Sequence, residues 1–247
     1  MAKPREHLTH APIAEALIDI RVLAREDITP DTFRSVIERL KDSYPASSPM
    51  RSVEARFAME EGKLLPPKQV DAVIGWLVQA TPPQSVAQFR INGFTYDKLE
   101  PYTRWEEVFA EADRLWRIYV ETAMPLEVTR LAVRYINRLR LPAAADLREY
   151  LEAPPVLPAP IPQTVREFLT RVVVYDAERN ASAIITQALE AALDSTVVPL
   201  LLDIDAFREA AIPPDDASMP RIFEQLRRLK NDVFFASITE KTAEMYA

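Results

Sequence analysis

Polar and apolar residues alternate along several stretches of the chain, and the clearest stretch lies near its beginning. In residues 16–23 the apolar positions alternate with Asp19 and Arg21. Successive side chains of a strand point to opposite faces, so this run predicts a strand that is buried on one side only. Alternating or continuously apolar runs predict further strands at 51–60, 71–81, 86–99, 126–141, 165–175, 181–189 and 197–207. The run 71–81 is equally compatible with a helix, and Gly93 is expected to mark a bulge or bend in its run.

Apolar residues recur at helical spacing in three longer stretches. The first, 33–40, follows Thr29 and Pro30, which suit the start of a helix. The second begins at Thr103 and continues for about five turns, and the third lies at 222–233. Short helices are expected at 146–151 and 239–246.

The predicted elements follow the same order in the two halves of the chain. Residues 1–123 and 124–247 each read as strand, helix, three strands and helix, although no sequence motif is repeated. We therefore predict a single α+β domain, 1–247, in which a curved antiparallel sheet packs on long helices. The TATA-binding-protein-like and helix-grip architectures fit this pattern. The segment 154–162 has five prolines in nine residues and is expected to form an extended connector.

The composition is that of an ordinary globular protein, with 48% hydrophobic and 27% charged residues. The net charge of −7 argues against general nucleic-acid binding, because neutralising phosphates requires an excess of lysine and arginine. No apolar run approaches the roughly 20 residues that cross a bilayer, and the N-terminal sequence lacks the apolar core of a secretory signal. We therefore expect a cytoplasmic protein without membrane contact.

Several common kinds of site are disfavoured by the residues that the sequence lacks. It contains no cysteine, which rules out disulfides, thiolate metal sites and thiol nucleophiles. The two histidines, His7 and His10, lie in the N-terminal tail, so a histidine base or metal cluster is not expected. The three glycines, Gly62, Gly75 and Gly93, are too far apart to form a Walker A loop or a dinucleotide-binding turn.

The most specific feature of the sequence is a row of arginines in one predicted strand. Arg130, Arg134, Arg138 and Arg140 stand at even positions, so all four point to one face while apolar residues point to the other. Arginine is suited to bidentate recognition of carboxylate and phosphate groups. The row therefore predicts a binding surface for an anionic group, which Arg90 is expected to join from another strand.

The acidic residues of the other strands leave three interpretations of this face open. They can pair with the arginines and form a solvated sheet face, as antiparallel sheets often have. They can also pair with arginines across the two-fold axis of a homodimer. Alternatively Asp203 and Asp205, which face the same way on one strand, can hold Mg²⁺ together with Glu15 while the arginines bind a phosphate ester or nucleotide.

Several short motifs of the chain resemble those of a sporadically distributed, uncharacterised bacterial family of about this length. They are 11–16 (APIAEA), Trp105 near the start of a long helix, Arg130, 134–138 (RYINR) and 237–239 (SIT). The resemblance extends over essentially the whole chain and is most specific in RYINR. It implies no substrate, catalytic residue or cofactor. The patchy distribution of the family is similar to that of genes in toxin–antitoxin and anti-phage loci, many of whose small proteins act by binding a partner.

Two residues of the RYINR motif point away from the arginines. We expect Tyr135 to be a core aromatic residue with a hydrogen-bonded hydroxyl group. Asn137 stands on a mostly apolar face, and a buried amide requires hydrogen bonds. Asn137 is therefore expected to tie the strand end to a neighbouring loop.

The absence of a recognisable catalytic set favours a binding function. The leading hypothesis is a non-enzymatic cytoplasmic interaction protein of a bacterial toxin–antitoxin or anti-phage locus. It would bind a protein partner, or an anionic small molecule, through Arg90 and the arginine row, and would need no cofactor. The alternative hypothesis is a Mg²⁺-dependent enzyme or sensor that acts on a phosphate ester or nucleotide.

Overall fold

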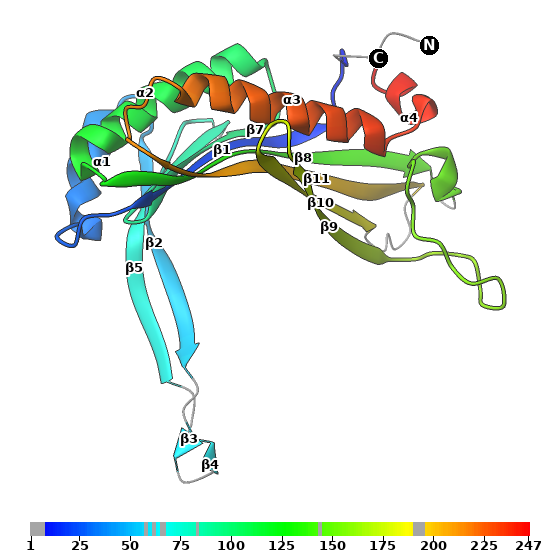
Figure 1. The fold of residues 1–247 in the computed structure, drawn as a ribbon, viewed down its shortest axis with the longest axis horizontal. Helices are drawn as coiled ribbons and strands as arrows, with labels where there is room; N and C mark the ends of the chain where they lie inside the picture. Colours follow the sequence, from blue (N-terminus) through cyan, green and yellow to red (C-terminus); the bar gives the residue numbers. More distant parts are fainter. Residues whose placement is uncertain are drawn as a thin grey trace.

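An open sheet of nine antiparallel strands dominates the computed structural model of the protein, which describes residues 8–56, 59–60, 63–64, 68–82, 84–142, 145–189 and 196–247 (Figure 1). The strand order is β2-β5-β6-β7-β1-β8-β11-β10-β9, and a small separate pair is formed by β3 and β4. The strands are β1 Ile13–Leu23, β2 Ala46–Arg56, β3 Met59–Glu60, β4 Lys63–Leu64, β5 Lys68–Gln79, β6 Ser85–Arg90, β7 Gly93–Leu99, β8 Glu127–Pro142, β9 Phe168–Asp176, β10 Ala181–Leu189 and β11 Val197–Ile212.

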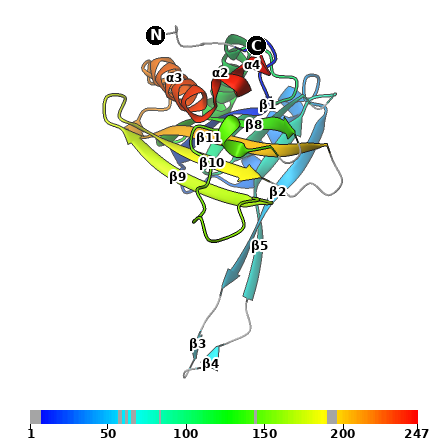
Figure 2. The ribbon, with the colours of Figure 1, turned by 90° about the vertical axis from the view of Figure 1, so that its right-hand side faces the viewer.

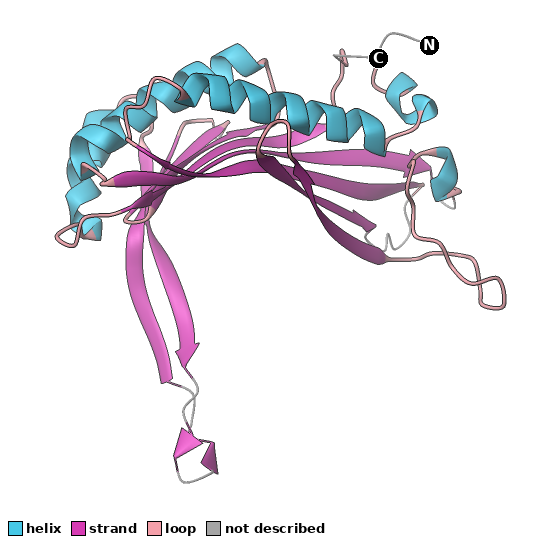
Figure 3. Cartoon of the chain, in the orientation of Figure 1, coloured by secondary structure: helices cyan, strands magenta, loops and turns pink. Residues whose placement is uncertain are grey.

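The α-helices lie on one side of this sheet, and the hairpin of β2 and β5 extends away on the other side (Figure 3). They are α1 Arg34–Leu40, α2 Trp105–Ala123, α3 Met219–Ser237 and α4 Glu240–Glu244, with short 3-10 helices η1 Pro30–Phe33 and η2 Leu147–Glu149. The α+β class is confirmed. The prediction of long helices is not borne out, because α2 and α3 have 19 residues each and α1 and α4 have seven and five. None of the described helices is long and apolar enough to cross a bilayer.

The centre of the sheet is the pair formed by β1 and β8, the first strands of the two predicted halves. From β1 the sheet continues through β7, β6 and β5, and from β8 it continues through β11, β10 and β9. The first half adds β2 beyond β5, so it contributes five strands to the sheet and the second half contributes four. The proline-rich segment 154–162 contains no helix or strand and leads from η2 to β9.

The predicted strand 86–99 is wrong, because the chain reverses there and forms the hairpin of β6 and β7. Apolar core positions change from odd to even numbers across the turn, from Phe89 to Phe94, and this change was the signal of the reversal. The ambiguous run 71–81 is the strand β5, and the predicted strand 51–60 falls on β2 and β3, apart from residues 57–58, which lie outside the described residues.

Gly93 opens β7 with a backbone φ of +155°, a conformation that side chains disfavour. A Cβ atom there would lie 2.4 Å from the carbonyl oxygen of Ile20 on β1. We expect Gly93→Ala to lower the free energy of unfolding by about 1–3 kcal/mol, measured by urea denaturation. Asn92→Ala changes the exposed turn residue beside it and should cost less than about 0.5 kcal/mol. Equal effects of the two substitutions would contradict this account.

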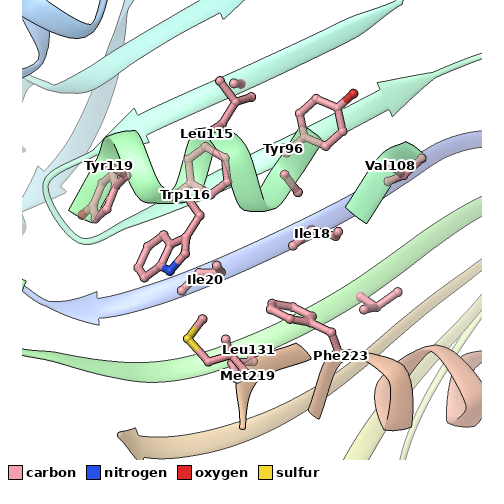
Figure 4. Close-up of a cluster of buried hydrophobic side chains, with 14 of the residues drawn as sticks. Ile18, Ile20, Tyr96, Val108, Leu115, Trp116, Tyr119, Leu131, Met219 and Phe223 are labelled. Atoms are coloured by element: carbon pink, nitrogen blue, oxygen red, sulfur yellow. The ribbon is translucent and has the colours of Figure 1, made fainter. Parts of the chain in front are cut away.

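The main core lies between the sheet and the two helices α2 and α3 (Figure 4). Ile18 and Ile20 of β1 are at most 2% exposed and face Trp116 of α2 and Phe223 of α3. The two helices run antiparallel where they meet, since Phe109 of α2 contacts Phe223 of α3, whereas Trp105, one turn earlier in α2, lies against Arg227, one turn later in α3. Because the apolar positions of each central strand face this core, its alternate positions necessarily face the side without helices.

Candidate functional site

The sheet face opposite the helices carries most of the candidate residues. In register, Asp19 of β1 lies opposite Thr95 of β7 on one side and Ala132 of β8 on the other. Arg134 of β8 lies opposite Leu17 and Asp205. The sheet bends so that its outer strands turn away from the helices (Figure 2). We call this the uncovered face, and its polar residues come from β1, β6, β7, β8 and β11.

Asp19 is the centre of a network on the uncovered face. Its Oδ1 accepts hydrogen bonds from Thr95 Oγ1 at 2.7 Å and Arg90 Nη2 at 2.9 Å. Its Oδ2 accepts from Arg21 Nε at 2.9 Å and Arg130 Nη1 at 3.2 Å. Burial alone would raise the pKa of Asp19, but the Thr95 hydrogen bond and the charges of Arg21 and Arg90 hold it below its usual value. Asp19 therefore stays ionised and neutralises several guanidinium groups at once.

Two arginines of the predicted row are paired with the carboxylates of β11. Arg130 Nη2 donates to Asp205 Oδ2 at 2.7 Å, and its guanidinium carbon lies 4.5 Å from the ring centroid of Phe207. Arg134 makes a bidentate contact with Asp203, through Nη2 at 2.6 Å and Nε at 2.9 Å. The expected cross-strand pairs of arginine and carboxylate are therefore present.

Arg138 and Arg140 differ from the rest of the row. Both side chains are exposed, and no carboxylate among the described residues contacts either of them. The register explains this difference, because Arg138 lies opposite Leu201 and Arg140 opposite Pro199 on β11. The structure thus divides the five predicted binding residues into Arg90 and Arg130, which are largely buried in ion pairs, the half-exposed Arg134, and the two exposed arginines.

The predicted magnesium ligands do not converge. Asp203 and Asp205 are each held by an arginine, and Glu15 is separated from Asp203 by the intervening Ile136 of β8. Two strand spacings place the Cα atoms of Glu15 and Asp203 roughly 10 Å apart. Across the described part of the chain, no three acidic, histidine or cysteine side chains form a group that could hold a metal ion. The geometry therefore gives the magnesium hypothesis little support.

Asp97 is a residue of the uncovered face that the sequence interpretation missed. It lies on β7 in the same row as Leu17 and Arg134, and its Oδ1 is buried without a hydrogen-bond partner in the described structure. Burial raises the pKa of Asp97 to about 7, with a contribution from Glu15 and an opposing effect of Arg134. A single strand over 86–99 would place the odd-numbered Asp97 on the face of Phe89, so the turn between β6 and β7 hid its position on the uncovered face.

The opposite face of β8 is packed against the helices. Tyr135 is 2% exposed and its hydroxyl group lies 3.0 Å from that of Tyr102, which confirms its predicted role. Asn137 Nδ2 donates to the carbonyl oxygen of Leu202 at 2.9 Å. Asn137 therefore ties β8 to the neighbouring strand, and the prediction of a loop contact was wrong. Lys230 of α3 places its Nζ 3.7 Å from the ring centroid of Tyr135.

Comparison of the chain with protein-family models gives no match, and no curated protein sequence matches it significantly. The resemblance of its RYINR motif to a bacterial family therefore stays a prediction. The interpretation of the uncovered face rests on its geometry and charge alone.

Proposed function

We propose that the protein is a non-enzymatic, cytoplasmic binding protein whose uncovered face binds an acidic segment of a protein partner. The observation that carries the proposal is the exposure of Arg138 and Arg140, which form no ion pair with the described residues, beside the half-exposed Arg134. Guanidinium groups that are not neutralised within the chain are available to bind carboxylates of another molecule, and their fork geometry suits bidentate contacts.

The other arginines have a supporting role in this proposal. Arg90 and Arg130 form ion pairs with Asp19, and Arg130 also pairs with Asp205. They therefore stabilise the uncovered face and contribute little to the binding of a further anionic group. Arg138 and Arg140 stand two residues apart on β8, which spaces them by roughly 6–7 Å. Acidic residues at alternate positions of an extended peptide have the same spacing, and this match favours an acidic, extended segment of a protein.

The biological setting of the proposal comes from the resemblance of the motifs. We infer that the protein belongs to a bacterial toxin–antitoxin or anti-phage locus and that its partner is encoded by a neighbouring gene. The finer fold assignment, a TATA-binding-protein-like or helix-grip arrangement, belongs to the same proposal. Its support is an antiparallel sheet with helices on one face and with β1 and β8 at its centre.

The double substitution Arg138→Ala/Arg140→Ala tests the binding surface. We expect it to weaken binding of the purified neighbouring-gene product by at least about tenfold, because each charge-assisted hydrogen bond contributes roughly 1.5–3 kcal/mol. Isothermal titration calorimetry at low and high salt measures the change. The loss should be larger at low salt, since exposed charges are screened by ions.

The matched control is Arg117→Ala/Arg228→Ala, which removes the same charge from exposed positions on α2 and α3. It should leave the affinity unchanged, and equal losses in both double variants would contradict the assignment of the surface.

The magnesium-dependent alternative is distinguished by thermal denaturation with nucleotides. A rise of several degrees in Tm only when Mg²⁺ is present would favour that alternative.

A further inference from the structure

The strand β9 forms one end of the sheet, and its outer edge is open. Apart from its pairing with β10, the backbone of β9 has no hydrogen-bonding partner among the described residues. Its apolar side chains are unusually exposed: Leu169 72%, Val172 54%, Val173 53%, Val174 38% and Tyr175 65%. Long, apolar edge strands are pairing surfaces that natural proteins normally shield with charges, prolines or other elements.

The exposed side chains lie on both faces of β9, which limits what can cover them. Val173 and Tyr175 lie in register with Ile184 and Ser182 on the side of the uncovered face, whereas Val172 and Val174 lie on the helix side. A helix or a small ligand would cover only one of these sides. An added strand contacts both, because its own side chains alternate and its backbone bonds to the free edge.

We propose that the strand added to β9 is the β9 of a second copy of this chain, in antiparallel orientation about a two-fold axis. Such an axis stands perpendicular to the sheet, so residues on the same face lie opposite each other. Centring the axis on Val173 pairs Val172 with Val174, Arg171 with Tyr175 and Thr170 with Asp176. Every pair occurs twice because of the symmetry.

The chemistry of β9 is complementary to itself in this register. Arg171 is one of two charged residues of the strand. In this register its guanidinium group lies beside the ring of Tyr175 of the second copy, and aromatic rings attract cations. The other, Asp176, already accepts a hydrogen bond from Arg179 within its own chain and can accept another from Thr170 of the partner strand. No like charges lie opposite each other, and the three valines form an apolar centre. The residues of β9 are therefore complementary to those of a second β9, and no other kind of partner is needed to explain the open edge.

The proposed interface differs from a homodimer formed through the charged face, which the sequence also allowed. The buried arginines and aspartates of that face are already paired within one chain, so they offer little to a second copy. Edge pairing leaves the uncovered faces of both copies on the same side of one continuous sheet. Arg138 and Arg140 of both copies would then be available to a partner, which permits bivalent binding.

A single strand pair forms a small interface, at or below about 1,200 Å², so we expect a dissociation constant in the micromolar range. Sedimentation equilibrium over a wide range of protein concentration should show a reversible monomer–dimer equilibrium. Val173→Lys places two ammonium groups next to each other at the axis and should weaken dimerisation by more than tenfold. The matched control is Val53→Lys, which alters a 63% exposed valine on β2, the opposite edge of the sheet, and should leave the equilibrium unchanged.

Disulfide formation tests the register independently, because the natural chain contains no cysteine. Val173→Cys lies opposite its own copy and should form a covalent dimer quickly under mild oxidation, whereas Leu169→Cys lies far from its symmetry mate and should react slowly. A wild-type chain that stays monomeric at all concentrations would overturn the proposal. So would dimerisation that is lost in Val53→Lys but retained in Val173→Lys, or equal rates of crosslinking in the two cysteine variants.

Discussion

Asp19→Ala is expected to lower the free energy of unfolding by about 3–5 kcal/mol, the range measured when one member of a buried charge network is removed. Asp19 is 14% exposed in its side chain and accepts hydrogen bonds from four side chains. Its removal leaves Arg90, which is 11% exposed, and Arg130, which is 23% exposed, with a deficit of negative charge. Desolvated guanidinium groups without a counter-charge are the main source of the expected loss.

Urea denaturation of the purified variant at neutral pH measures this loss. Asp27→Ala is the matched control, because Asp27 forms an ion pair with Arg25 and its side chain is 65% exposed. Exposed pairs contribute about 0–1 kcal/mol, so the control should change stability little. A loss in Asp19→Ala no larger than in Asp27→Ala would show that the network on the uncovered face contributes little to folding.

The pH dependence of the stability difference between the wild type and Asp19→Ala tests whether the ionised carboxylate stabilises the folded protein. The pKa of Asp19 is lowered in the folded state, so folding is favoured by its ionisation, and this contribution is lost as pH falls below the unfolded value of about 4. The difference in stability between the wild type and Asp19→Ala should therefore shrink in acid. A difference that grows in acid would contradict the role assigned to the Asp19 carboxylate.

The positions of the strands were predicted best where one face of the strand is buried and the other is exposed to solvent. For β8 and β10 the alternation of side chains is imposed by a single core, so local pattern and tertiary structure agree. The sequence did not predict the hairpin of β6 and β7, because polar and apolar residues alternate in both strands and only two residues separate them. Only the shift from Phe89 to Phe94 marks the reversal.

The candidate site could be predicted only in part, because it depends on register between strands that are far apart in the sequence. The alternation places Arg130, Arg134 and Arg138 on one face, and the structure agrees. Which arginines are neutralised depends on whether an aspartate or an apolar residue of β11 lies close by. That pairing joins residues about 70 positions apart, and no local pattern encodes it.

The buried Lys230 shows a different limit of sequence interpretation. The helical stripe of α3 includes Phe223, and Lys230 follows seven residues later, so it lies on the same side of the helix. A lysine at such a position often reaches solvent by extending its flexible side chain. In this structure the lysine is 8% exposed and its Nζ lies over the Tyr135 ring. The packing of Tyr135 and Tyr102 beneath α3, which the sequence does not reveal, decides its burial.

Burial lowers the pKa of Lys230 to about 7, and the nearby positive charge of Arg227 contributes to the same direction. The ring of Tyr135 favours the ammonium form and offsets part of this shift. The phenol groups of Tyr135 and Tyr102 have raised pKa values because of burial, so they stay neutral and provide no counter-charge at physiological pH. Lys230 therefore carries a desolvation cost in the folded state that an apolar side chain of similar length would not have.

We expect Lys230→Met to raise the free energy of unfolding by about 2–4 kcal/mol at pH 7, since each unit of pKa shift corresponds to about 1.4 kcal/mol. The unfolded chain binds more protons at this site than the folded chain between the folded pKa of about 7 and the unfolded value of about 10.4. The difference in the free energy of unfolding between Lys230→Met and the wild type should therefore decrease as pH rises through this window. Urea denaturation between neutral and alkaline pH measures the difference.

The matched control is Lys41→Met, which removes an exposed lysine next to the end of α1. Its difference from the wild type should be small and should not change across the same pH window, because the exposed side chain loses little of its hydration on folding. If Lys230→Met lowers stability at pH 7, the contact with Tyr135 must exceed the desolvation cost, and the lysine must be charged in the folded protein. A destabilising lysine makes the stability difference shrink as pH rises from about 7 to about 10.4, whereas a stabilising cation–π contact leaves the difference constant there and removes it only at higher pH, so a single series of denaturation curves distinguishes the two.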